Sequence, residues 1–241
     1  MVGKNVPKNQ SLVLTRYIYR LTYCKKGRAK FISHLDLMRT MQRAFKRAKL
    51  PVWYTQGFNP HPYIMFPLAL ALGTESEIEP MDIALLEKYS FDELKNRLNE
   101  VLPEGLKIMA VAEPVCEHTD VLKSEYVIEI ETDKSPEDVK NSFVEFLNGE
   151  TVEISKRTRD KRTKKVSFKN IDVKEHIELL GIEALNDVVK LELRLSTSAG
   201  NTFNLNFAPV IDAFSEKYSI GITHISANRT KILCKNGEIF S

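Results

Sequence analysis

Hydrophobic and polar positions follow two different periods along the first half of the chain. Alternation and short runs of β-favouring residues predict strands at 16–24, 63–67, 81–86 and 106–112, with a further short strand at 52–55. Apolar residues spaced by three or four positions predict amphipathic helices at 33–49 and after Ser90. Ser33 and Ser90 are the expected N-caps. We therefore expect the order strand, helix, strand, strand, helix, strand.

The second half repeats this order less regularly. Strands are predicted at 125–131, 177–185, 188–195, 220–225 and 231–234, helices at 135–147 and 207–218, and a hairpin at 151–155 and 166–168. The repeated order is that of a split βαβ unit. The prediction is an α+β fold with two ferredoxin-like (βαββαβ) halves, the second with extra strands. The halves span 12–115 and 122–241, and the second carries a basic hairpin at 155–169.

Basic residues gather in two runs, although the net charge is only +3. Between Arg16 and Lys49 eleven basic residues face one acidic residue, Asp36, and between Lys156 and Lys169 eight face one acidic residue. Such asymmetry is expected of a polyanion binder, because cations that neutralise phosphates release condensed counterions. The candidate RNA-binding cations are Arg28, Lys30, Arg39, Arg43, Lys46, Arg47, Lys156, Arg157, Arg159, Lys161, Arg162, Lys164 and Lys165. The alternative is that the acidic segment 75–137 compensates these charges in space.

Aromatic residues occur within or close to the first basic run. Single-stranded RNA is held by bases that stack on aromatic rings beside a basic groove. The loop 56–62 offers Phe58 and Asn59 for such contacts. Tyr17, Tyr19 and Tyr23 share one face of the first predicted strand. They form either a stacking surface or, as we expect for most of them, a core layer under the helix.

His34, at the start of the first predicted helix, and His61, in the loop 56–62, are the candidate catalytic residues, together with Asp36. Histidine transfers protons near neutral pH or ligates a metal, and a helix N-terminus attracts phosphate. We expect the two histidines to lie close together at one end of the sheet, near Asn59 and Phe58. A structural role for each is the alternative. Their spacing matches no zinc pattern, so no metal or other cofactor is predicted.

The three cysteines, Cys24, Cys116 and Cys234, are far apart in the sequence. Their odd number and wide spacing favour reduced thiols over a disulfide framework, and they offer no closely spaced set for an iron–sulfur cluster. No apolar run approaches the ~20 residues of a membrane span, and the first ten residues lack the apolar stretch of a signal peptide. We expect a cytoplasmic protein that contacts no membrane.

Three stretches resemble the signature of the radical-SAM-linked family, a domain of unknown function found fused to, or encoded beside, radical-SAM proteins. They are RAKFISHLDLMR at 28–39, QGFNPHP at 56–62 and GTESE at 73–77. The resemblance is strongest over residues 16–112. It implies that a radical-SAM protein is a separate partner, since this chain lacks the clustered cysteines of such an enzyme.

The leading hypothesis is a bacterial-type RNA-binding accessory factor that works with a radical-SAM partner in RNA modification. One alternative is a metal-independent endoribonuclease in which His34 helps to activate a ribose 2′-hydroxyl, by analogy with endoribonucleases built from tandem ferredoxin-like domains. The other is a protein–protein adaptor for the radical-SAM enzyme. An enzymatic activity of the chain itself is the less favoured interpretation.

Overall fold

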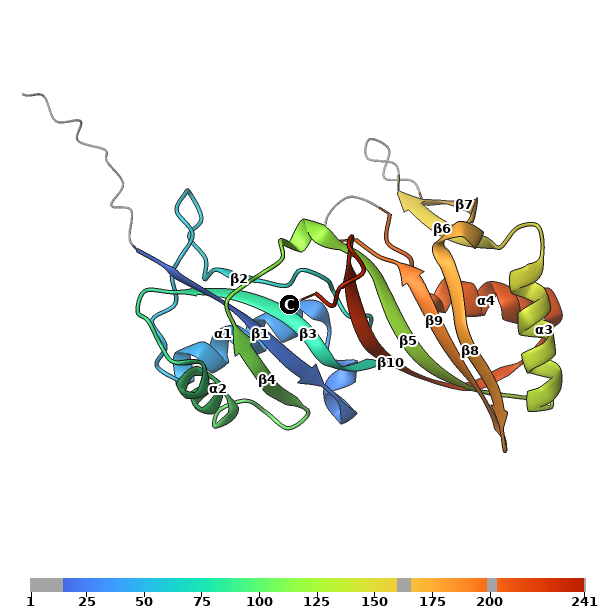
Figure 1. Ribbon diagram of the computed structural model, residues 1–241, viewed down its shortest axis with the longest axis horizontal. Coiled ribbons are helices and arrows are strands. Elements are labelled where there is room, and N and C mark those ends of the chain that lie inside the picture. The colour runs from blue at the N-terminus through green and yellow to red at the C-terminus, as the bar shows by residue number, and fades with distance from the viewer. Residues whose placement is uncertain (1–14, 160–165, 199–202, 241) are drawn as a thin grey trace, which may run out of the picture.

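A computed structural model describes residues 15–159, 166–198 and 203–240 (Figure 1). The strands are β1 (Tyr17–Lys25), β2 (Ile64–Met65), β3 (Thr74–Leu85), β4 (Leu106–Ala112), β5 (Val121–Thr132), β6 (Glu153–Arg159), β7 (Val166–Asp172), β8 (Ile177–Leu185), β9 (Val188–Ser196) and β10 (Ile222–Cys234). The α-helices are α1 (His34–Arg47), α2 (Phe91–Asn99), α3 (Pro136–Asn148) and α4 (Phe207–Tyr218). Short 3-10 helices are η1 (Gly27–Phe31), η2 (His118–Asp120) and η3 (Lys174–His176).

One mixed sheet runs through the whole molecule in the order β4-β1-β3-β10-β5-β9-β8, with β2 paired to β3 (Figure 1). The first half contributes the order β4-β1-β3-β2 and the second half the order β10-β5-β9-β8. In the first half β1 lies between β4 and β3, and in the second half β5 lies in the corresponding place between β10 and β9. The halves join where β3 and β10 pair in parallel, with Ser76 opposite Arg229. Strands β6 and β7 form a separate two-stranded ribbon, and in the sequence they lie between α3 and β8.

The predicted order of elements in the first half is found in the structure, and the fold is a mixed α/β arrangement with a large sheet. Some details are wrong. The strand expected at 81–86 begins earlier, because β3 spans Thr74–Leu85. The strands expected at 220–225 and 231–234 are one strand, β10, and residues 52–55 form only isolated bridges, Val52 to Leu85 and Tyr54 to Pro62. The two halves share one sheet, and their description as separate ferredoxin-like domains, with a boundary between 115 and 122, stays a prediction.

The helices begin at polar caps and are held by apolar faces. Ser33 accepts a hydrogen bond from the Asp36 amide at 3.1 Å, and Ser90 and Ser135 cap α2 and α3 in the same way. On α1, Met41 and Phe45 are almost fully buried against β1 and β3. Burial of each such side chain stabilises the fold by roughly 1.5–3 kcal/mol.

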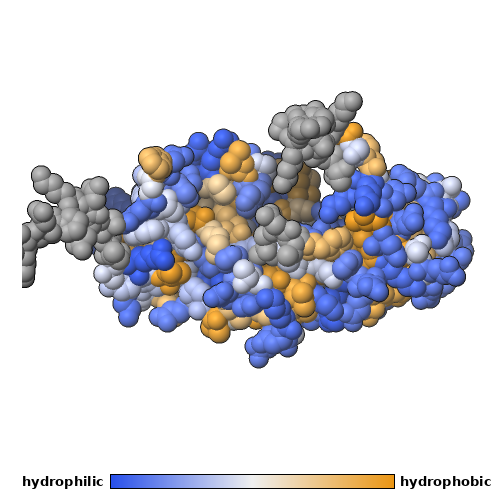
Figure 2. All heavy atoms as spheres, turned by 90° about the horizontal axis from the view of Figure 1, so that it is seen from above, coloured by the Kyte–Doolittle hydropathy of each residue, from blue (hydrophilic) through white to orange (hydrophobic). Residues whose placement is uncertain are grey.

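The helices lie on one face of the sheet, and every second side chain of the central strands points toward them. Tyr19 and Leu21 of β1 join a core with α1 and α2, while Ile128 and Ile130 of β5 join a second core with α3 and α4. The intervening positions, such as Arg20, point to the opposite face. Seen from above, apolar residues show between hydrophilic ones in the middle of the molecule (Figure 2). None of the helices in the described part of the chain has the length and apolar character of a membrane span.

Candidate nucleic-acid interface

The outer side of α1 carries the predicted cations. Leu37, Met41, Ala44 and Phe45 are buried in the core, and the exposed side of the helix carries Leu35 and the cations Arg39, Arg43, Lys46 and Arg47. Arg39 pairs with Asp36 at 3.2 Å, and Arg47 donates a hydrogen bond to the carbonyl oxygen of Val101 at 2.7 Å. Among the described residues Arg43 and Lys46 form no ion pair. These two side chains are therefore available to an external anion.

Several cations that precede α1 are compensated inside the protein. Arg20 is buried and donates to both carboxylate oxygens of Asp82, at 2.7 and 2.8 Å. Lys26 pairs with Glu77, and Lys30 lies 3.3 Å from Glu75. The alternative interpretation of the first basic run, compensation by the acidic segment, is confirmed for these residues. Arg28 stays exposed.

Residues 52–63 form an irregular hairpin that projects beyond the sheet (Figure 1). It is closed by hydrogen bonds from the amide of Thr55 to the carbonyl of His61 and from the amide of Tyr63 to the carbonyl of Trp53, both at 2.9 Å. Phe58 near its tip is fully exposed. Because side chains alternate along such a hairpin, Tyr54 points toward α1, where it lines a small groove with Lys46.

His61 has a structural position in this hairpin. Its Nδ1 lies 3.1 Å from the hydroxyl of Thr55 and 3.1 Å from the carbonyl oxygen of Asn59. Its backbone amide donates to the same Thr55 hydroxyl at 3.2 Å. These contacts hold the tip of the loop, and they leave Phe58 and Asn59 exposed to solvent.

The structure does not bring His34 and His61 together. His34 starts α1 and packs edge-on against Phe66, with ring centroids 5.2 Å apart. His61 adjoins Pro62, which lines the groove beside Lys46 near the other end of the helix. His34 and Lys46 are twelve positions apart on α1, which corresponds to a rise of roughly 18 Å at ~1.5 Å per residue. The expected site that combines both histidines at one end of the sheet is therefore not assembled.

Asp36 acts locally on α1. Its carboxylate accepts a hydrogen bond from the Ser33 hydroxyl at 2.8 Å and pairs with Arg39. The Ser33 bond, followed by the Arg39 contact, lowers the pKa of Asp36. Partial burial, followed by the charge of Lys25, lowers the pKa of His34. Within the described residues no group of three His, Cys, Asp or Glu side chains is placed to hold a metal ion.

The second basic run lies on the β6–β7 ribbon. Lys156 is exposed, and its ammonium group lies 5.3 Å from the ring centroid of Phe203. Arg157 and Arg159 belong to β6. The remaining predicted cations, Lys161, Arg162, Lys164 and Lys165, lie outside the described residues.

A buried polar cluster at the junction of the two halves could not be found from sequence patterns. Arg229 on β10 donates to both carboxylate oxygens of Glu79 on β3, and Tyr126 on β5 lies 3.5 Å from the same guanidinium. Lys25, also buried, donates to the carbonyl oxygen of Ile32 at 3.1 Å. Tyr23 packs into the same region and is buried as expected for a core residue, and Tyr19 is buried too.

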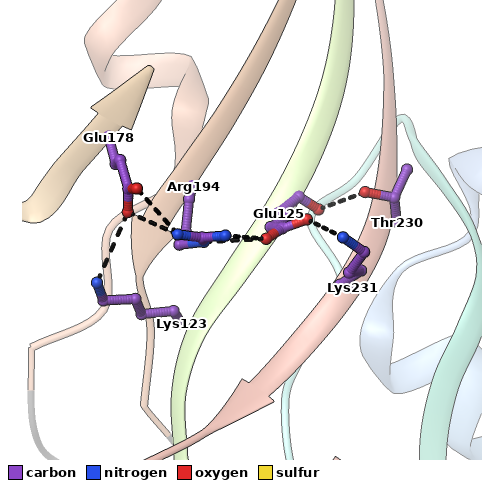
Figure 3. A network of polar contacts seen from close by, with 6 residues as sticks. All are labelled: Lys123, Glu125, Glu178, Arg194, Thr230 and Lys231. Atoms are coloured by element: carbon purple, nitrogen blue, oxygen red, sulfur yellow. Dashed lines mark hydrogen bonds and ion pairs between the residues drawn. The ribbon is translucent and has the colours of Figure 1, made fainter. Parts of the chain in front are cut away.

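On the open face of the second half, charged side chains form a ladder across the sheet (Figure 3). Arg194 lies between Glu125 and Glu178, with contacts of 2.6 and 2.9 Å. Lys231 pairs with Glu125 at 2.8 Å, and Lys123 lies 3.8 Å from Glu178. Because the charges alternate in sign and pair with one another, this face is a weaker candidate for a polyanion than the outer side of α1.

A chain in the crystal structure of a Cbf5–Nop10–Gar1 complex is 14% identical, with a TM-score of 0.45, and the match covers 89% of this protein but 48% of that chain. This protein thus spans about half of that chain's length. An unknown protein from Galdieria sulphuraria is 12% identical, with a TM-score of 0.26, over 89% of this protein and 99% of the other.

Both likenesses are too low in TM-score to support an argument about function. No curated protein matches the sequence. One family model, by contrast, matches residues 18–206, which include β1, α1, the hairpin and most of the second half. The chain belongs to the family described as "uncharacterized protein conserved in bacteria (DUF2344)".

Proposed function

We propose that the protein binds single-stranded RNA along the outer side of α1 and the hairpin 52–63. One observation carries this proposal: Lys46 lines a groove with Tyr54 of the hairpin, Arg43 is exposed one turn earlier on α1, and the hairpin also exposes Phe58. Phosphates bind to cations, while unstacked bases bind to aromatic faces, so this pairing of side chains suits a flexible strand better than a duplex.

The role that we propose for this binding is to present RNA to a radical-SAM partner for modification. The proposal of such a partner depends on the sequence resemblance over residues 16–112. The β6–β7 ribbon, with exposed Lys156, would extend the basic surface in the second half. No cofactor is required of the chain itself in this role.

The two alternatives draw less support from the structure. A general base at His34 would lack His61 as a partner, because the two lie near opposite ends of α1. An adaptor for a protein partner would use the same cations and also the exposed ring of Phe58, because aromatic side chains anchor protein–protein interfaces as well. Direct RNA binding therefore separates the RNA hypothesis from the adaptor hypothesis.

Fluorescence anisotropy with labelled single-stranded and hairpin RNA, beside DNA of matched sequence, tests the proposal. Across ~50 to ~300 mM salt, log affinity for the single strand should fall by roughly 0.7 per phosphate contacted for each unit of log salt. The double variant Arg43→Gln/Lys46→Gln should weaken binding and reduce this slope. Phe58→Ala should weaken binding with an unchanged slope.

A charge-matched control is the double variant Lys107→Gln/Lys134→Gln, which removes two exposed cations away from α1. It should leave affinity and slope near their original values. Equal losses of affinity in the two double variants would show that binding depends only on the overall charge of the protein, and would contradict the proposed surface. Gel analysis of the same samples reports cleavage, and cleavage that His34→Ala abolishes would favour the endoribonuclease instead.

A further inference from the structure

A cavity of about 1040 Å³ opens beside the start of β1. There β4 has ended, so β1 forms the edge of the sheet. β1 pairs with β3 from Tyr17 onward, but with β4 only from Arg20 onward. Residues 17–19 line the cavity, so main-chain groups of a strand edge face it. The segments 88–91 and 113–118 form further walls. Its volume lies just above the usual range of small-molecule sites, roughly 300–1,000 Å³.

Aromatic rings line this cavity and are held in place before any ligand binds. Tyr17 and Phe91 are partly exposed, at 37% and 44%. Phe91 packs edge-on against buried Tyr19, with ring centroids 6.2 Å apart. The Tyr19 hydroxyl accepts a hydrogen bond from the Tyr89 amide at 2.8 Å and donates one to the Tyr89 carbonyl at 3.2 Å. The wall before α2 is thereby fixed to β1.

The charges around the cavity are balanced overall but separate: in the described part of the chain Arg16 and Lys88 are the unpaired cations, and Glu113 and Glu117 are acidic residues on the segment after β4. This arrangement suits a ligand with an anionic group beside the cations and N–H groups beside the carboxylates. The guanidinium of Arg16 lies 4.8 Å from the ring centroid of Trp53 and 5.7 Å from that of Tyr63, so the two rings hold this cation at the rim. Lys88 is exposed on another wall, and within the described residues neither it nor Arg16 forms an ion pair. Glu113 on the segment after β4 adds an acceptor for N–H groups.

The floor of the cavity is rigid and electrically balanced. The buried pair of Arg20 and Asp82 forms it, and the Arg20 guanidinium lies 4.1 Å from the ring centroid of Phe240. A charge held in this way cannot move to a ligand without exposing its partner, which is costly in a buried site. Binding therefore depends on the rim cations and on the aromatic walls.

We propose that this cavity binds one nucleotide, with the base against Tyr17 and Phe91 and the phosphate at Arg16 and Lys88. This inference rests on the proposed RNA function, because the nucleotide would be one that is splayed out of the bound strand. The hairpin connects the two surfaces: Tyr54 lines the groove beside α1, while Tyr63 lines the cavity. A strand that crosses the hairpin can thus reach both.

Binding of AMP, GMP, CMP and UMP, each without RNA, tests the cavity directly. Titration calorimetry should give saturable binding in the millimolar range or tighter, and ribose 5-phosphate, which lacks a base, should bind much more weakly. Cys116 lines the cavity and is partly exposed, whereas Cys24 is partly exposed on β1 and does not line it. A bound nucleotide should slow alkylation of Cys116 and leave the rate at Cys24 unchanged.

Arg16→Gln should weaken mononucleotide binding about tenfold, as for loss of one charge-assisted hydrogen bond, and Lys107→Gln should not. Phe91→Ala provides a second variant, with circular dichroism to verify its fold. Absence of both heat and Cys116 protection would overturn the cavity proposal and leave RNA binding by α1 standing. Equal binding of ribose 5-phosphate would overturn recognition of a base. Mononucleotide binding without any RNA binding would support the cavity and overturn the proposed function.

Discussion

The guanidinium of Arg229 on β10 is paired with the carboxylate of Glu79 on β3, a residue 150 positions earlier in the chain, with Nε 2.8 Å from Oε1. Both side chains are almost completely buried. The pair lies where the two halves of the sheet meet, so the stability of the junction depends on an interaction that no local sequence pattern reveals.

Glu79→Ala should destabilise the protein strongly, because it leaves the charge of Arg229 buried without a partner. Loss of one member of a buried pair costs about 3–5 kcal/mol. Denaturant unfolding followed by circular dichroism measures the change. The control is Glu77→Ala, which breaks the exposed pair with Lys26 and should cost about 0–1 kcal/mol. Similar losses in the two variants would contradict the importance of the junction.

Glu125 should make the stability depend on pH in the acidic range. Burial by itself would raise the pKa of Glu125, but hydrogen bonds from Lys231 and Arg194 outweigh it and hold the pKa below the ordinary value of 4.5. A carboxyl group with a depressed folded-state pKa adds stability above its unfolded pKa, and this stability is lost as the pH falls through the folded value.

Glu125→Gln should therefore be less stable than the original protein above about pH 5, by roughly 1.5–3 kcal/mol, as for hydrogen bonds to a charged group. The difference should shrink as the pH is lowered below 4.5. Unfolding curves of both proteins across this range measure it. A difference that stays constant down to strongly acidic pH would argue against a charged Glu125 in the folded state.

Lys25→Met should raise the pKa of His34, because it removes the nearby positive charge while the partial burial of the ring remains. The pKa of His34 should still lie below the ordinary value of 6.5. Titration of the imidazole carbon-bound protons by NMR measures both values. Lys26→Met is the matched control, since Lys26 is paired with Glu77 and is not among the causes of the shift. An unchanged His34 pKa in the Lys25 variant would show that burial alone accounts for the shift.

Gly105→Ala should destabilise the turn before β4 by more than Gly237→Ala. Both glycines have left-handed backbone angles, with φ of +83° and +82°. A Cβ at position 105 would lie 2.5 Å from the carbonyl oxygen of Lys26 and 2.8 Å from the Cβ of Ala29, whereas one at 237 would meet nothing within 4 Å. Backbone strain costs on the order of 1–3 kcal/mol in each variant, and the clash adds to it only at 105. Equal melting temperatures would contradict this.

Elements with an unbroken hydrophobic period could be predicted from the sequence. The bounds of β4, β8 and α4 match the predicted ranges 106–112, 177–185 and 207–218. The prediction failed at β10, because register shifts near Arg229 interrupt its alternation. It also missed the start of β3, because the acidic residues Glu75, Glu77 and Glu79 leave few apolar positions there. That stretch is a strand because Ser76 and Glu79 lie between β1 and β10 and contact Arg229.

The candidate site could be predicted only in part, because some of its features depend on local spacing and others on contacts between distant segments. The exposure of Arg43 and Lys46 could be predicted, because the side of a helix on which a residue lies follows from its spacing to the apolar residues of the same helix. The pairing of Lys26 and Lys30 with Glu77 and Glu75 depends on how β1 and β3 align, which a single sequence does not contain. The cavity at Tyr17 and Phe91 depends on the point at which β4 stops pairing with β1.

The position of β10 also affects the order in which the protein can be assembled on the ribosome. β10 follows all other described strands in the chain, yet it lies between β3 and β5 in the middle of the sheet. Until it is synthesised, the nascent chain holds two incomplete sheets, each with a long unpaired edge. Exposed edges of this kind pair with other chains and aggregate. Premature termination before residue 222 should therefore produce insoluble polypeptide rather than a smaller folded protein.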